Sequence, residues 1–135
     1  MAATTVQAKK ALRAAMLKLK RSIPEAQITL QSQLITNHVI HAPFFEEINA
    51  VSCYLSIPGE VDTSSLVLSI LRSGKKLFVP KVESGKLHMV RLYGEEDFRT
   101  LRQGVWGIKE PSWEWESRRR ESGEAHVLDL KHTYI

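Results

Sequence analysis

The sequence predicts an α/β fold with a mainly parallel open sheet and helices on both faces. Two short apolar runs, at residues 50–55 and 76–80, suit strands that are covered on both faces. Between them, residues 63–73 carry apolar side chains at helical spacing. A strand, a helix and a strand within about thirty residues form a crossover unit, so the two strands are expected to be parallel. We assign residues 1–135 to a single domain, because this length suffices for one buried core.

Two helices are predicted before the first strand. The first covers residues 6–23, where three large apolar residues recur at helical spacing: Leu12, Met16 and Leu19. Pro24 and Glu25 suit the first turn of the second helix. This helix is expected to end near residues 41–43, since proline disfavours the helical conformation in the residue before it. Its buried stripe is predicted to consist of Ile28, Leu34, Ile35 and Val39.

The crossover unit and a later strand follow in order. Asp62 or Thr63 can cap the helix between the two strands, and Ser73-Gly74 ends it. Its predicted inner face consists of Leu66, Val67, Ile70 and Leu71. Residues 87–92 alternate weakly and form a further candidate strand. Residues 112–135 are expected to be an irregular tail that diverges from the rest.

Composition limits the function classes. The chain is 43% hydrophobic and 25% charged, as in ordinary soluble proteins, and no run is long enough to span a membrane. Its lone cysteine, Cys53, is interpreted as a packed thiol and fits a reducing compartment. We expect a cytoplasmic protein, with a mitochondrial location as the alternative because the first 24 residues are basic and lack acids. The net charge of +4 permits nucleic-acid binding, but no recognition motif supports it, and Arg118–Arg120 are interpreted as a solvated loop.

Glu60 stands where the first strand ends in the turn Ile57-Pro58-Gly59. Open parallel sheets bind ligands beyond the carboxyl ends of their strands, so this carboxylate could accept hydrogen bonds from ligand amino groups. Equally, it could favour the positive end of the following helix, and the pattern leaves both readings open. Trp106, between Gly104 and Gly107, is placed for stacking. The five histidines show no paired metal-ligand spacing, so we expect no metal site from this chain's side chains alone.

Five segments together resemble the 5-formyltetrahydrofolate cyclo-ligase (methenyltetrahydrofolate synthetase) family. In order they are AKKALR, YLSIPGEVDT, GKKLFVPKV, LHMVRL and GVWGIKEP, and they span residues 8–111. The resemblance implies an α/β fold and an ATP- and magnesium-dependent enzyme. That enzyme converts 5-formyltetrahydrofolate into 5,10-methenyltetrahydrofolate.

The resemblance also implies roles for particular residues. Lys9, Lys10 and Arg13 match the basic segment that contacts ATP in the family. Leu55 and Glu60 match positions that line the folate pocket, with Glu60 a partner for the pterin nitrogens. Trp106 matches an aromatic residue that packs against the folate.

The end of the chain departs from the family pattern. After Val127–Leu130 the family continues into a Gly-rich segment that supplies phosphate contacts and a magnesium-binding acid, whereas this sequence reads KHTYI. We therefore expect a C-terminally truncated member that lacks the last strands and is inactive alone. Folate and ATP are the expected partners of a monomer, without nucleic acid or membrane. The alternatives are a non-catalytic fragment that binds folate or a protein partner, and a basic nucleic-acid-binding module.

Overall fold

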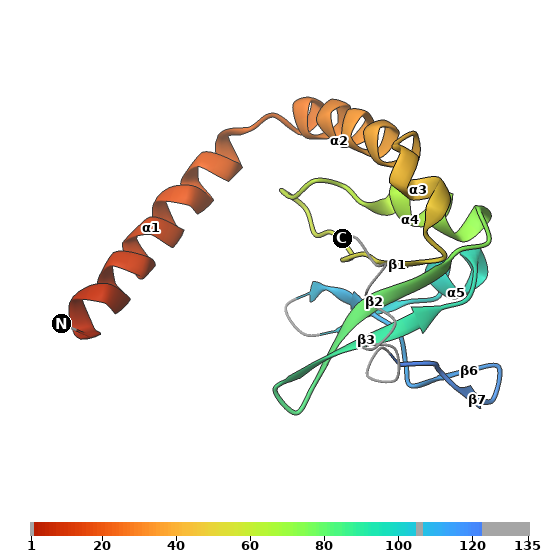
Figure 1. Cartoon of the computed structure of the whole chain (residues 1–135). Coiled ribbons are helices and arrows are strands. Elements are labelled where there is room, and N and C mark those ends of the chain that lie inside the picture. The colour runs from red at the N-terminus through yellow and green to blue at the C-terminus, as the bar shows by residue number, and fades with distance from the viewer. Residues whose placement is uncertain (1, 105–106, 123–135) are drawn as a thin grey trace.

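The computed structural model describes residues 2–104 and 107–122 of the chain. Helices and strands alternate only in the middle of the chain (Figure 1). The helices are α1 (Ala2–Ser22), α2 (Glu25–Ile40), α3 (Pro43–Glu47), α4 (Ser64–Arg72) and α5 (Glu95–Arg99). The longer strands are β1 (Ala50–Ser52), β2 (Lys76–Glu83) and β3 (Lys86–Leu92). Four two-residue strands follow: β4 (Arg102–Gln103), β5 (Lys109–Glu110), β6 (Glu114–Trp115) and β7 (Arg118–Arg119).

The central sheet has the order β1-β2-β3. β1 and β2 are parallel with Val51 opposite Leu77, which confirms the predicted crossover through α4. β3 runs antiparallel to β2, and Leu92 lies opposite Leu77. The α/β class is thus confirmed, while the described sheet is mixed rather than mainly parallel. The antiparallel pair arises because residues 84–85 form a tight turn, with both Ser84 and Gly85 at positive φ.

The core lies on one face of this sheet. Val51, Leu77 and Leu92 share that face because they are opposite one another in register. Helix α4 covers them with Val67 and Ile70, both fully buried, as predicted for its inner face. Further side chains complete the cluster. Val79 comes from β2, and the others come from the segments around α3, after β1 and in α5: Phe45, Ile48, Cys53, Leu55 and Phe98.

The strand predicted over residues 50–55 is shorter and less covered than expected. β1 ends at Ser52, although the amide of Cys53 still donates to the carbonyl of Phe78 at 3.0 Å. Burial alternates along the run, since Cys53 and Leu55 are buried while Tyr54 is 47% exposed. The expectation of cover on both faces was therefore wrong. Burial raises the pKa of the Cys53 thiol to about 11, which confirms its interpretation as a packed thiol.

The apolar stripe predicted for helix α2 is correct only in part. Val39 packs against the core and Ile28 is partly buried, whereas Leu34 and Ile35 are exposed and the buried positions are Ser32 and Thr36. The hydroxyl of Ser32 accepts a hydrogen bond from the amide of Asp62 at 2.8 Å. A buried polar group needs such a partner, so this bond explains why a serine occupies an inward position.

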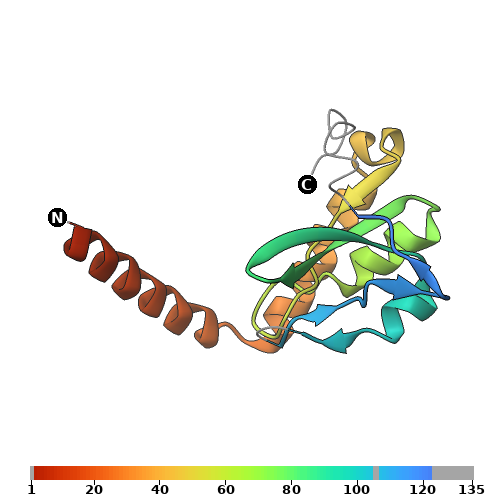
Figure 2. The same cartoon turned by 90° about the horizontal axis from the view of Figure 1, so that it is seen from below.

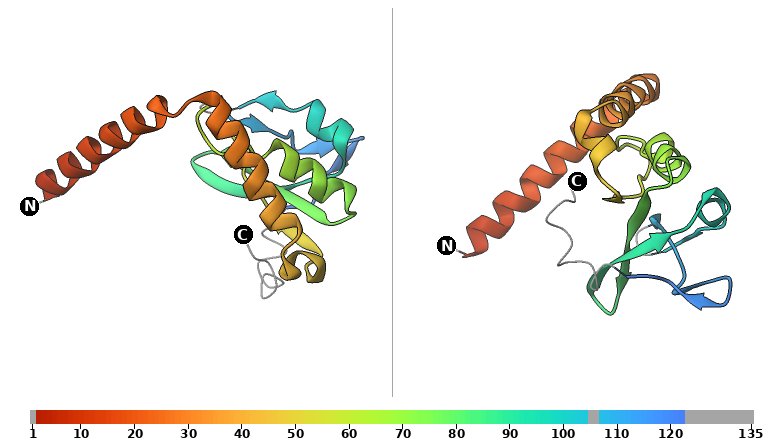
Figure 3. Two further views of the ribbon diagram at one scale, coloured as in Figure 1. Left: turned by 90° about the horizontal axis from the view of Figure 1, so that it is seen from above. Right: turned by 45° about the vertical axis from the view of Figure 1, so that its right-hand side comes forward.

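Helix α1 projects away from the rest of the molecule, as the views in Figures 2 and 3 agree. Its described side chains, from residue 4 onward, are all exposed. The apolar stripe predicted from the sequence is present but contacts no core, with Leu12 63% exposed and Leu19 59% exposed. The exposed stripe makes α1 the element least determined by packing in this structure.

Two hairpins follow α5. β4 and β5 pair antiparallel around the loop of the GVWGIKEP segment, where the amide of Gly104 donates to the carbonyl of Ile108 at 2.7 Å. A Cβ at Gly104 would lie 2.7 Å from the carboxylate carbon of Glu110, so any larger residue there would displace this side chain. That carboxylate accepts the amide of Val82 at 3.0 Å and so ties the hairpin to β2. β6 and β7 form the second hairpin. Residues 114–119 were expected to be irregular, and for them this expectation was wrong.

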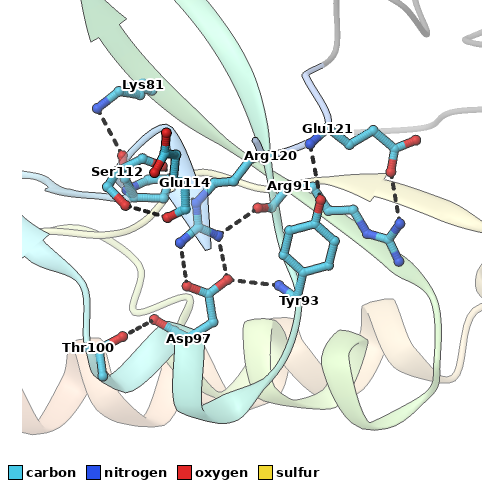
Figure 4. A network of polar contacts seen from close by, with 10 residues as sticks. Lys81, Arg91, Tyr93, Asp97, Thr100, Ser112, Glu114, Arg120 and Glu121 are labelled. Atoms are coloured by element: carbon cyan, nitrogen blue, oxygen red, sulfur yellow. Dashed lines mark hydrogen bonds and ion pairs between the residues drawn. The ribbon is translucent and has the colours of Figure 1, made fainter. Parts of the chain in front are cut away.

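Arg120 is buried rather than solvated, which corrects the interpretation of Arg118–Arg120. Its guanidinium forms two hydrogen bonds to Asp97, at 2.5 and 2.7 Å, and donates to the carbonyls of Ser112 and Arg91 (Figure 4). The carboxylate of Asp97 also accepts a hydrogen bond from the backbone amide of Tyr93. This network joins the segment after β7 to α5 and β3.

Candidate functional site

The Pro58–Gly59 turn after β1 presents Glu60. The amide of Glu60 donates to the carbonyl of Ile57 at 3.2 Å, which closes a reverse turn. Gly59 has a φ of +91°, a conformation that other residues rarely adopt. One carboxylate oxygen of Glu60, Oε2, accepts the amide of Ile57 at 3.2 Å. In the described part of the chain, the other oxygen has no hydrogen-bond partner and is available to a ligand.

The ends of this loop are fixed by a reciprocal pair of hydrogen bonds. The amide of Ser56 donates to Thr63 Oγ1 at 3.2 Å, and the amide of Thr63 donates to Ser56 Oγ at 3.0 Å. Thr63 is buried, and its hydroxyl also donates to the carbonyl of Tyr54 at 2.8 Å. These bonds hold residues 57–62 as a rigid loop, so the position of Glu60 is set before any ligand binds.

Asp62, and not Glu60, serves the start of α4. Its Oδ1 accepts the amide of Ser64 at 2.9 Å, while Glu60 bonds back to its own turn. The hydrogen bond from the Ser64 amide is the main cause that lowers the pKa of Asp62. Thr63 occupies the N-cap position without a side-chain cap bond. Glu60 thus forms no cap bond to α4 in the described part of the chain, and the alternative that its charge favours the helix end stays a prediction.

Two open hollows flank this loop. The first has a volume of about 500 Å³ and the second about 550 Å³. Both lie within the size range of ligand sites, roughly 300–1,000 Å³. The residues common to both are Lys20, Ile23, Ile28, Gly59 and Glu60. The first hollow is completed by Gln31, Tyr54 and Val61, and the second by side chains that include Arg21, Thr29 and Asp62.

The shared wall of the hollows combines an acid, a cation and two isoleucines. Glu60 and Lys20 supply opposite charges, and Ile23 and Ile28 supply apolar surface. Beside them, the Tyr54 hydroxyl donates to the carbonyl of Val61 at 3.3 Å. Burial raises the pKa of Tyr54, and the nearby Glu60 carboxylate raises it further. This arrangement suits a ligand with hydrogen-bond donors at one end, an apolar middle and an anionic end.

The other residues predicted for the site are not brought to the hollows. Leu55 is buried in the core and does not line either of them. Lys9, Lys10 and Arg13 lie exposed on α1. With a rise of about 1.5 Å per residue, Arg13 lies about 10 Å and Lys9 about 16 Å from Lys20 along the helix axis. Trp106 lies outside the described residues.

Sequence reasoning missed six residues that line the first hollow: Lys20, Ile23, Ile28, Gln31, Tyr54 and Val61. Tyr54 precedes the Pro-Gly turn within the same motif, so its position could have drawn attention. Lys20 and Gln31 belong to α1 and α2, and only the bend between these helices brings them to the loop. No local pattern marks such a tertiary approach.

Among residues 2–104 and 107–122, no group of three or more His, Cys, Asp and Glu side chains is arranged to hold a metal ion. None of the helices in that part of the chain has the length and apolar character needed to cross a membrane.

Comparisons with known proteins agree on one family. The model of the 5-formyltetrahydrofolate cyclo-ligase family matches residues 5–130. A Caenorhabditis elegans protein described as a probable 5-formyltetrahydrofolate cyclo-ligase is 31% identical over 115 residues, covering 82% of this chain and 56% of the relative. The Mus musculus 5-formyltetrahydrofolate cyclo-ligase is 33% identical over 114 residues, with the same two coverages. The chain thus spans about half the length of these curated relatives.

The fold comparison gives the same answer. The solution structure of Aquifex aeolicus 5,10-methenyltetrahydrofolate synthetase matches with a TM-score of 0.68 and 27% sequence identity. The match covers 84% of this chain and 54% of that one. Sequence and fold therefore point to the same group of proteins.

Proposed function

This chain belongs to the 5-formyltetrahydrofolate cyclo-ligase family, and on that basis we propose that it binds 5-formyltetrahydrofolate at the loop that presents Glu60. The reaction proposed for it is the ATP-dependent conversion of this folate into 5,10-methenyltetrahydrofolate. The single observation that carries the proposal is the free carboxylate oxygen of Glu60 beside two hollows of ligand size. A reduced pterin carries amino and ring N–H groups, and such an oxygen can accept hydrogen bonds from them.

The rigid loop supports selectivity for this ligand. Glu60 is held from one side by the Ile57 amide and, at the loop ends, by the Ser56–Thr63 pair. A carboxylate that is already oriented loses little freedom on binding, so more of the hydrogen-bond energy appears as affinity. A charged hydrogen bond of this kind contributes roughly 1.5–3 kcal/mol.

ATP is proposed to bind through Lys9, Lys10 and Arg13. Lys9 and Arg13 are four residues apart and share a helical face, so both can approach one triphosphate. In this structure the three side chains are exposed on α1, which projects away from the rest of the molecule (Figure 1), and none of them lines either hollow. We therefore propose that residues 1–135 alone do not turn over, since phosphoryl transfer requires the γ-phosphate to be aligned with the formyl oxygen.

Magnesium is the metal that the family reaction implies, and it would neutralise charge on the phosphates. The acids that line the hollows are Glu25, Glu60 and Asp62, and the last two accept hydrogen bonds from backbone amides. Among the described residues these carboxylates are not arranged to hold a metal ion, and no step of the proposal depends on magnesium.

Titration of residues 1–135 with 5-formyltetrahydrofolate tests the proposal, with a single-stranded oligonucleotide as the competing class of ligand. Each titration is done at two salt concentrations. The proposal predicts saturable folate binding with a weak dependence on salt, because at most a few charges take part. Oligonucleotide binding that falls steeply with salt, without folate binding, would support the nucleic-acid alternative instead.

A further inference from the structure

We propose that Lys20 binds the glutamate carboxylates of the reduced folate and thereby fixes the direction in which the ligand lies across the hollows. This inference rests on the proposed function, because it names the residue that recognises the second end of the same ligand. It concerns binding only and involves no chemical step.

The first observation is the distribution of charge in the two hollows. Lys20 is the one basic residue that lines both, and Glu60 is the one acidic residue that lines both. Arg21, Glu25 and Asp62 line the second hollow alone. Whichever hollow a ligand enters, it therefore meets Glu60 and Lys20 together.

The second observation is that Lys20 remains uncommitted. Among the described residues, it forms no ion pair with a carboxylate, and its side chain is exposed. Several cations elsewhere are already paired, such as Lys76 with Glu121, Arg72 with Glu95 and Arg120 with Asp97. A ligand carboxylate would thus meet a lysine that has no protein partner to give up.

The third observation is the position of Lys20 in its helix. It lies in the last turn of α1, two residues before the helix ends at Ser22. Only Ile23 and Pro24 separate that end from α2, and the amide of Ile23 donates to the carbonyl of Lys20 at 3.2 Å. This short connection, with φ of Pro24 fixed by its ring, holds the base of Lys20 near the start of α2.

The ligand has a matching polarity. A 5-formyltetrahydrofolate molecule has N–H donors on its pterin, an aromatic ring in the middle and two carboxylates on its glutamate. The N–H groups of the pterin can donate hydrogen bonds to Glu60. The aromatic ring in the middle can pack against the apolar side chains of Ile23 and Ile28, which line both hollows. The carboxylates would be repelled by Glu60 and attracted by Lys20, so one orientation is favoured.

The test compares 5-formyltetrahydrofolate with the primary amide of 5-formyltetrahydropteroate, which has the same rings and carries an uncharged amide in place of the glutamate. Wild-type residues 1–135 should bind the folate roughly two- to fivefold more tightly than this pteroate amide, the range expected for a solvent-exposed ion pair. Lys20→Gln should remove this difference and leave the affinity for the pteroate amide unchanged. Lys20→Arg should keep it. Lys18→Gln, on the same helix and outside both hollows, is the matched control.

Each outcome decides something. If wild type binds the two ligands equally, or if Lys20→Gln weakens both alike, the role of Lys20 is overturned while folate binding stands. If the control weakens folate binding as much as Lys20→Gln, general charge rather than Lys20 is responsible, and the inference fails. If wild type binds neither ligand, the proposed function itself is wrong, and this inference falls with it.

Discussion

Asp62 is a single carboxylate that supports both the loop and the helix after it. It accepts the Ser64 amide and, at 3.5 Å, the Ser56 hydroxyl. Its pKa is lowered, mainly by the bond from the Ser64 amide. A carboxyl group with a lower pKa in the folded state stabilises the fold above its unfolded pKa, near 4. That contribution is lost as the pH falls through the folded value.

We therefore predict that Asp62→Asn reduces the acid sensitivity of the fold. Wild type should lose stability between neutral pH and about pH 3, and the variant should lose less over the same range, because its amide does not titrate. Chemical unfolding at a series of pH values measures both curves. Curves that stay parallel below about pH 4 would show that Asp62 does not contribute to the acid dependence.

Arg120 and Asp97 give a second prediction at the residue scale. Replacing Arg120 with Met should lower the free energy of unfolding by about 3–5 kcal/mol, because Asp97 would remain buried without its partner. Arg118→Met changes an exposed arginine two residues away and should cost less than about 0.5 kcal/mol. Denaturant unfolding compares the two variants. Equal, small losses would mean that the buried pair does not hold the segment after β7 in solution.

At the scale of elements, apolar periodicity predicted the inner face of α4 correctly and that of α2 only in part. In α4 the inner positions are apolar, so counting apolar residues finds the buried face. In α2 the inner positions include Ser32 and Thr36, which a count of apolar residues assigns to solvent. Ser32 is inward because it accepts the Asp62 amide, a contact thirty residues away in the chain. Periodicity cannot include such a bond.

The contrast between α1 and α4 leads to a third prediction. Ile70→Ala removes a fully buried side chain and should cost about 2–5 kcal/mol of stability. Leu12→Ala changes a side chain that is 63% exposed on α1 and should cost less than about 0.5 kcal/mol. Both losses are measured by denaturant unfolding. A Leu12 loss as large as that of Ile70 would mean that α1 packs against the core in solution, contrary to Figure 1.

For the molecule as a whole, local patterns predicted the first half better than the second. The crossover unit needs only two apolar runs and one helical period, all close in sequence. The hairpins after α5 depend on distant contacts, such as the bond from Val82 to Glu110 and the pair of Asp97 with Arg120. For the site, Glu60 could be found from its place at a strand end. Lys20 could not, because the bend between α1 and α2 sets its position.

The arrangement of the whole chain gives a fourth prediction. Residues 1–135, supplied with ATP, magnesium and 5-formyltetrahydrofolate, should form no 5,10-methenyltetrahydrofolate above background. The reason is that α1, which carries Lys9, Lys10 and Arg13, projects away from the rest of the molecule (Figures 1 and 3), so the two substrates would not be aligned. Product absorbance is the measurement, with the Mus musculus relative assayed in parallel as the positive control. A rate comparable to that of the relative would contradict the arrangement proposed for the two substrates.

Binding of 5-formyltetrahydrofolate at Glu60 is tested most directly by titrating wild type and Glu60→Gln with this ligand. The glutamine keeps an oxygen that can accept the Ile57 amide, so the melting temperature should hardly change. Affinity should fall by roughly ten- to a hundredfold, as expected for a lost charged hydrogen bond. Glu47→Gln, an exposed change on α3, should leave the affinity unaltered. If Glu60→Gln binds the folate as tightly as wild type, Glu60 does not recognise the pterin and the proposed site is wrong.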